Sequence, residues 1–109
     1  MSASTAVQFL RNACSRAQIT TQLYADGASR CVAINVGVNG LILISGAAGG
    51  ARENEIDYHP REHQGWGAVY YSDCVHGDDV RDFYQSTDPD LVQDTSRLLA
   101  AVQNIIAGH

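Results

Sequence analysis

Hydrophobic positions near the start of the chain recur at the period of a helix. From Ala6 through Leu10 to Ala17, apolar side chains return every three or four residues across residues 4–17. Ser4 precedes this pattern, where an N-cap residue belongs, and polar residues fill the opposite face. The pattern therefore predicts an amphipathic N-terminal helix.

The next apolar segments are shorter and predict strands. Residues 19–25 end at an Asp-Gly turn pair. Residues 30–38 are followed by Asn39-Gly40, which favours a tight hairpin turn because both residues tolerate positive φ. The run LILIS at Leu41–Ser45 is continuously apolar, which is typical of a central strand that is covered on both faces. Together these segments predict an antiparallel meander over residues 19–45.

The middle of the chain is less regular. Residues 46–65 show little periodicity, and a stretch of that length in a compact domain indicates either a functional loop or an unrecognised element. Residues 66–74, with the sequence WGAVYYSDC, have the aromatic and β-branched content of a further strand. We expect a short helix at residues 78–85.

The last element is a long amphipathic helix. Asp88 is expected to cap it, Pro89 to occupy its first position and Gly108 to end it. Its apolar row comprises Leu91, Thr95, Leu98, Val102 and Ile105, with Val92, Leu99 and Ile106 alongside. Such a wide stripe is expected to cover the sheet. A homodimer seam through the same helix is the alternative.

These elements predict one α+β domain over residues 1–109. It has an N-terminal helix, an antiparallel sheet of about four strands, a short helix, and a long C-terminal helix packed on the sheet. The three cysteines are widely spaced, which favours reduced thiols in the cytoplasm. We expect no membrane span because the sequence lacks a continuous apolar run of the necessary length.

Charge is distributed unevenly along this chain. Of its 12 acidic residues, all except Asp26 lie between Glu53 and Asp94. The net charge of −5 argues against direct binding of nucleic acid, which requires clustered Lys and Arg. A negative surface instead favours a basic protein partner.

Aromatic residues are interleaved with these acids, as in protein interfaces where aromatic anchors have a charged surround. The expected partner-contacting residues are Glu53, Glu55, Asp57, Tyr58, Glu62, Trp66, Tyr71, Asp73, Asp78, Asp79 and Asp82. They predict a non-catalytic binding protein, without a cofactor, that engages a basic target through residues 53–82. A nucleic-acid-processing enzyme is one such target.

In charge and architecture, this small acidic helix–meander–helix chain resembles bacterial immunity proteins and phage-encoded inhibitors of defence systems. That resemblance implies an inhibitor that presents carboxylates where phosphates would bind. The order of helix, three strands, further sheet and long helix also resembles type III secretion chaperones, which implies an acidic dimer. The chain departs from that second pattern because it has no clear helix after LILIS.

Histidines and small residues supply a different hypothesis. The candidate metal ligands are His59, His63, Cys74 and His76. Their spacing matches no zinc signature, and Pro60 disfavours a helical His59, so we expect no metal site. The glycine-rich segment 46–50 follows an apolar strand but lacks the Lys and hydroxyl of a P-loop. A nucleotide- or metal-binding protein, or a small enzyme, that uses residues 46–76 is therefore the alternative.

Overall fold

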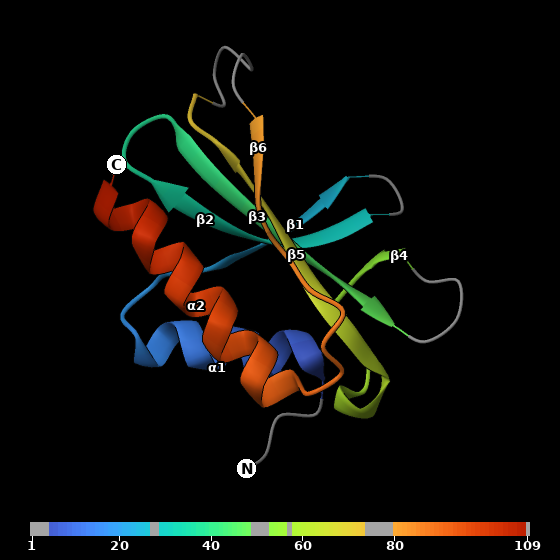
Figure 1. Ribbon diagram of the computed structural model, residues 1–109. Coiled ribbons are helices and arrows are strands. Elements are labelled where there is room, and N and C mark those ends of the chain that lie inside the picture. The colour runs from blue at the N-terminus through green and yellow to red at the C-terminus, as the bar shows by residue number, and fades with distance from the viewer. Residues whose placement is uncertain (1–4, 27–28, 49–52, 57, 74–79, 109) are drawn as a thin grey trace.

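Helices open and close the chain, and strands occupy its middle (Figure 1). The computed structural model describes residues 5–26, 29–48, 53–56, 58–73 and 80–108. In chain order the elements are α1 (Ala6–Arg16), β1 (Gln22–Asp26), β2 (Ser29–Val36), β3 (Gly40–Ala48), β4 (Glu53–Glu55), the 3-10 turn η1 (Pro60–Glu62), β5 (His63–Tyr71), β6 (Val80–Gln85) and α2 (Leu91–Gly108).

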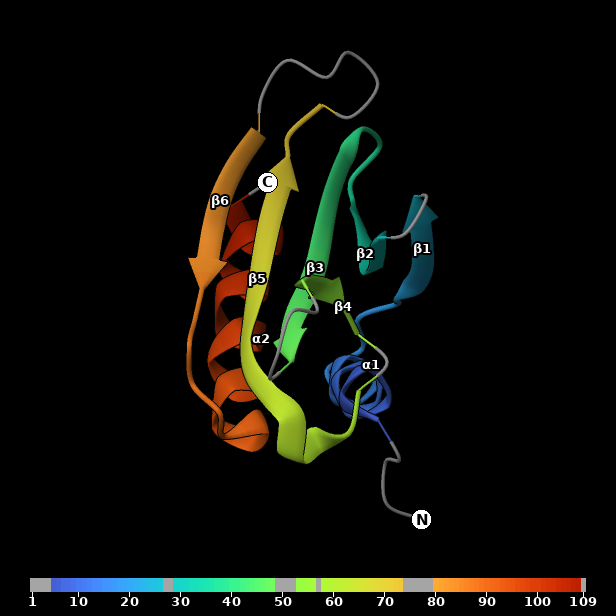
Figure 2. The same ribbon diagram turned by 90° about the vertical axis from the view of Figure 1, so that its right-hand side faces the viewer.

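The strands form one antiparallel sheet in the order β1-β2-β3-β5-β6, and β4 pairs with the end of β3. The predicted α+β class, with its N-terminal helix, antiparallel meander and long C-terminal helix packed on the sheet, is confirmed. The sheet has more strands than expected. Both helices lie on one side of it, and Figure 2 views it from the other side, with α2 behind β5 and β6.

The prediction of a short helix at residues 78–85 is wrong. Residues 78 and 79 lie outside the described part of the chain, and Val80–Gln85 forms β6, which pairs with β5 from Tyr71↔Val80 to Gly67↔Gln85. Val80, Phe83 and Tyr84 are β-branched or aromatic, and such residues favour a strand. Pairing with β5 therefore fixes this segment as an edge strand of the sheet.

The long irregular stretch contains elements that the sequence did not reveal. β3 continues to Ala48, β4 follows, and β5 begins at His63 rather than at the predicted Trp66. The turn η1 forms because Pro60 starts it and His59 caps it: Nδ1 of His59 accepts the Arg61 N–H at 3.1 Å. This capping interaction turns the chain into β5. Residues 49–52 lie outside the described part.

Local capping sets the start of each helix. The side chain of Thr5 accepts the Gln8 N–H at the start of α1, whereas the predicted cap, Ser4, lies outside the described residues. At α2 the cap is Asp90, whose Oδ1 accepts the Gln93 N–H at 3.2 Å. The prediction of Asp88 as the cap is therefore wrong by two residues, because Asp88 instead accepts the Asp90 N–H.

The hairpin between β2 and β3 forms where Asn39-Gly40 predicted it, but a different residue makes the turn. Gly37 has a φ of 65°, in the left-handed region that favours glycine. Gly40 already belongs to β3 and pairs with Val36. The register that follows places Ile34 opposite Ile42 on the side of the sheet that faces the helices.

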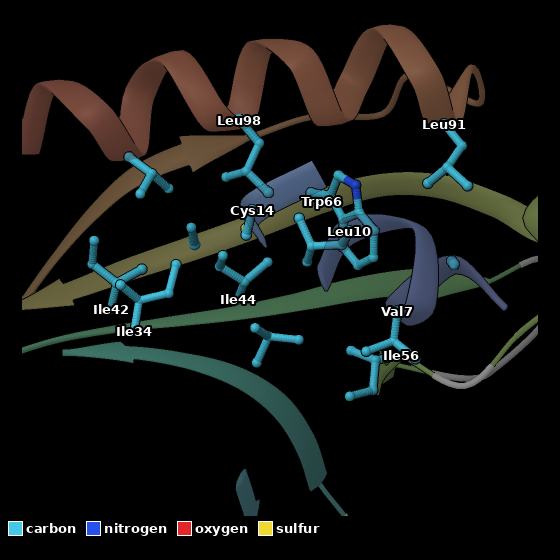
Figure 3. Packing of buried hydrophobic residues seen from close by; sticks show 14 of the residues in the cluster. Val7, Leu10, Cys14, Ile34, Ile42, Ile44, Ile56, Trp66, Leu91 and Leu98 are labelled. Atoms are coloured by element: carbon cyan, nitrogen blue, oxygen red, sulfur yellow. The ribbon is translucent and has the colours of Figure 1, made fainter. Parts of the chain in front are cut away.

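The hydrophobic core lies between that side of the sheet and the two helices. Figure 3 shows Leu91 and Leu98 directed from α2 toward the strands, and Leu10 of α1 beside Trp66. The core comprises Ala6, Val7, Leu10, Cys14, Val32, Ile34, Val36, Ile42, Ile44, Ile56, Tyr58, Trp66, Ala68, Leu91, Leu98 and Val102. The apolar row of α2 thus covers the sheet, as predicted. Val92 remains exposed, and the homodimer seam through α2 stays a prediction.

Candidate protein-interaction face

A chain of hydrogen-bonded polar side chains crosses the core between the sheet and α2. The hydroxyl of Tyr58 lies 2.6 Å from Nδ1 of His63, at the start of β5. Nε2 of His63 lies 2.6 Å from Oδ2 of Asp94, in the first turn of α2. All three side chains are buried. These contacts link residues far apart in the sequence through one continuous path.

Asp94 also accepts hydrogen bonds from β5 and β6. Its Oδ2 accepts the backbone N–H of Trp66 at 2.8 Å, and its Oδ1 accepts the hydroxyl of Tyr84 at 2.5 Å. The adjacent Thr95 accepts the indole N–H of Trp66 at 2.9 Å. Both carboxylate oxygens of Asp94 are therefore engaged, which is what a buried carboxylate requires.

One assignment of protons satisfies these groups. The hydroxyl of Tyr58 donates to Nδ1 of His63, Nε2–H donates to Asp94, and the carboxylate accepts from the other donors. Burial, reinforced by the charge of Asp94, raises the pKa of Tyr58 above its ordinary value. Burial and then the hydrogen bond and charge of Asp94 raise the pKa of Tyr84 to about 12. Both hydroxyls consequently stay protonated and donate at neutral pH.

The buried position of this network corrects two expected partner contacts. Trp66 is 1% exposed and Tyr58 is 2% exposed, so neither side chain reaches a partner at the surface. Their rings pack against the imidazole of His63, with centroid distances of 4.7 Å for Trp66 and 5.8 Å for Tyr58. These aromatic residues hold α2 on the sheet, and the prediction that they anchor a partner is wrong.

The candidate metal ligands do not converge in the described residues. Both ring nitrogens of His63 have hydrogen-bond partners in the core, while His59 is exposed and caps η1. Cys74 and His76 lie outside the described part of the chain. Within that part, no group of three His, Cys, Asp or Glu side chains could hold a metal ion.

The other side of the sheet exposes a different kind of surface. The pairings Leu43↔Val69, Leu41↔Tyr71 and Ala33↔Leu43 place these side chains on the side away from the helices. We define the open face by Ala33, Leu41, Leu43, Val69, Tyr71 and Val80. Ala33 is buried among its neighbours, Val80 is exposed, and the others are half-buried. Figure 2 looks onto this face.

An apolar open face is unusual for an antiparallel sheet. When one face of such a sheet contacts water, its outward positions are normally polar. Here the outward positions of β3 start with Leu41 and Leu43, and Ser45 alone among the three is polar. A contiguous apolar patch on a protein surface often marks an interaction site. The open face is therefore the candidate functional site.

Two of the predicted partner-contacting residues belong to this side of the sheet. Tyr71 lies within the open face, and Asp82 is exposed on β6 opposite Val69. Glu62 is exposed in η1, and Asp73 is half-buried after β5. The side chains of Glu53 and Glu55, and the residues Asp57, Asp78 and Asp79, lie outside the described part. The structure thus brings Tyr71 and Asp82 together and leaves the remaining acids unassigned to a common face.

Sequence reasoning missed two groups of residues. Asp94 and Thr95 follow Leu91 at helical spacing, on the apolar side of α2. A carboxylate at such a position indicates a buried hydrogen-bonding partner, because a buried charge must be paired. Sequence reasoning also did not identify Leu41, Leu43 and Val69 as surface residues. The LILIS run predicted a strand that is covered on both faces, but in the described residues the helices cover only one face of β3.

No family model matches this chain, and no curated protein or solved structure matches it either. Among the described residues, no helix is long and apolar enough to cross a membrane. The fold and the candidate site therefore define a class only, an antiparallel α+β domain with helices on one face of its sheet and an apolar surface on the other.

Proposed function

We propose that this chain is a non-catalytic binding protein whose open face engages a protein with a basic surface. The apolar row formed by Leu41, Leu43, Val69 and Tyr71 carries this proposal. Because these residues are paired across the neighbouring strands β3 and β5, they form a continuous patch. A partner that covers the patch would give β3 the second apolar layer that LILIS favours.

Charge supports the choice of a basic partner. The chain has a net charge of −5, and Asp82 is exposed beside the open face, opposite Val69. Acids at the rim of an apolar patch accelerate encounter with a basic surface and disfavour acidic competitors. Tyr71 on the same face has the combination of apolar ring and hydroxyl that is common in interface anchors.

The cytoplasm is the compartment that we infer for this protein. Cys14 is a buried thiol, and burial raises its pKa to about 11 although the charge of Arg11 opposes the shift. A protonated, buried thiol is protected from oxidation and exchange. Such a residue suits a domain that packs its core without a disulfide in a reducing environment.

Affinity capture with matched baits tests the proposed function. The wild type, a Leu43→Gln/Val69→Gln double variant and a Val92→Gln control are immobilised, and bound proteins from an extract of the source organism are identified by mass spectrometry. Val92 is 64% exposed on α2, the helix behind the sheet in Figure 2, so its substitution removes an exposed apolar side chain that is not part of the open face. We expect a basic protein on the wild type and the control but not on the double variant.

Charge reversal then tests the electrostatic part. The Asp82→Arg substitution, alone and with reversal of Asp78 and Asp79, should weaken binding of the captured protein, and added salt should reduce the difference between variants. Thermal melting of each bait establishes that it is folded. A captured protein that binds the double variant as tightly as the wild type would show that the open face is not the binding site.

A further inference from the structure

The two edges of the sheet differ in how they limit pairing with another strand. β6 has a register shift between Ala68 and Val69 of its partner, and it exposes the charged Arg81 and Asp82. Bulges and charges are features that protect an edge. β1 pairs with β2 without a register shift, and it exposes Leu23 (60%) and Tyr24 (45%). Within the described residues, no strand pairs with the outer edge of β1.

A groove of about 750 Å³ lies beside this edge, between α1 and the segment that leads into β1. One wall comes from α1, with Gln8, Arg11, Asn12 and Ser15, and the other includes Thr21 and Leu23. Leu23 is on the helix side of the sheet, because its partner Val32 belongs to the core. A strand added at β1 would therefore insert alternate side chains into the groove, between Leu23 and α1.

Arg11 gives the groove a chemical preference. Its Nε donates to Oγ1 of Thr21 at 3.0 Å, and its guanidinium also donates to the carbonyl of Thr21 at 3.3 Å. These bonds hold the side chain at the residue just before β1, while a guanidinium has five N–H donors. Among the described residues that line the groove, Arg11 is the sole ionisable side chain. An incoming carboxylate is the group that this arrangement complements.

We infer that the edge of β1 accepts an extended strand from another protein, and that this strand directs an acidic side chain toward Arg11. Its backbone would satisfy the unpaired N–H and C=O groups along β1, as in other cases of strand addition. Its apolar side chains would cover Leu23 and Tyr24. This second site is distinct from the open face and stands whether or not the proposed function holds.

Selection from a random twelve-residue peptide library displayed on phage tests this inference. We expect enriched peptides to alternate β-branched residues with an acidic residue, and we expect amide exchange in β1 to slow when such a peptide is bound. Arg11→Gln should weaken binding of the enriched peptide about ten- to hundredfold, as loss of a charge-assisted contact does. The matched control is Arg16→Gln, because Arg16 is exposed at the end of α1 and does not line the groove.

A second variant separates binding from folding. Leu23→Glu changes an exposed side chain and repels an acidic strand, so it should abolish binding of the peptide without changing the melting temperature. The inference is overturned if no peptide is enriched, or if the enriched peptides bind Arg11→Gln and Leu23→Glu as well as the wild type. A dimer in light scattering that Leu23→Glu dissociates would also overturn it, because β1 would then pair with a second copy.

Discussion

The two faces of the sheet use similar side chains in opposite surroundings. On the helix side, Ile42 and Ile44 of β3 are fully buried beneath α1 and α2. On the open face, Leu41 and Leu43 of the same strand are half-buried, and neither of the two helices in the described residues lies over them. Alternate residues of one apolar run therefore have different roles. The inner residues stabilise the fold, and the outer ones form surface that a partner can cover.

The two faces also differ in where they place a carboxylate. The helix side contains the fully buried Asp94, which is stabilised by donors from β5 and β6, including Trp66 and Tyr84. The open face has an exposed carboxylate, Asp82, beside apolar residues. A buried carboxylate fixes how α2 docks on the sheet, because each of its hydrogen bonds demands one geometry. An exposed one is available for a partner.

The largest expected effect comes from removing the buried carboxylate. Asp94→Ala leaves His63, the Trp66 N–H and the Tyr84 hydroxyl without their acceptor, so we expect the free energy of unfolding to fall by about 3–5 kcal/mol. Asp82→Ala on the open face should change it by less than about 0.5 kcal/mol. Urea denaturation followed by Trp66 fluorescence measures both. Equal effects would mean that the two carboxylates do not differ in role.

A pair of glycine substitutions tests the packing of each face. A Cβ at Gly46 would clash with the Tyr58 hydroxyl oxygen and lie 2.9 Å from the Trp66 ring. Among the described residues, a Cβ at Gly67 would come no closer than 3.9 Å to its nearest neighbour, the Ser45 carbonyl. Gly46→Ala should therefore lower the unfolding free energy by about 1–3 kcal/mol. Gly67→Ala should leave it unchanged or raise it by up to about 1 kcal/mol, since alanine is less flexible than glycine. Destabilisation by Gly67→Ala that matches Gly46→Ala would contradict the assignment of faces.

How much the sequence reveals differs between these faces. Periodicity was sufficient for both helices, because the apolar residues of each face one core, and short apolar segments with turn pairs were sufficient for the meander. The buried network could not be read from spacing, since Tyr58, His63 and Asp94 meet only after α2 returns over the sheet. The open face was hidden for a different reason. LILIS reports the hydrophobicity of β3 but does not say whether the second layer comes from this chain or from a partner.

Alkaline pH should weaken the attachment of α2 through Tyr84. Its pKa is about 12 in the folded protein and about 10 when unfolded, so the folded state holds its proton more tightly. The resulting stabilisation is complete below pH 10 and is lost as pH rises toward about 12. Tyr84→Phe should make the fall in melting temperature over this range shallower. The exposed Tyr24→Phe serves as the control, and an unchanged slope in Tyr84→Phe would exclude Tyr84 as the titrating group.

The smallest effect on stability is expected from making the open face polar. In a Leu43→Thr/Val69→Thr double variant, threonine has the β-branched shape that suits a strand, and the replaced side chains are only half-buried. The free energy of unfolding should fall by less than about 1 kcal/mol, while fluorescence of a dye that binds apolar surface should decrease. A loss of 3 kcal/mol or more, a magnitude expected for core residues, would mean that this chain itself covers the patch. That result would contradict the distinction between a core face and a partner-binding face, because both faces would then stabilise the fold of this chain.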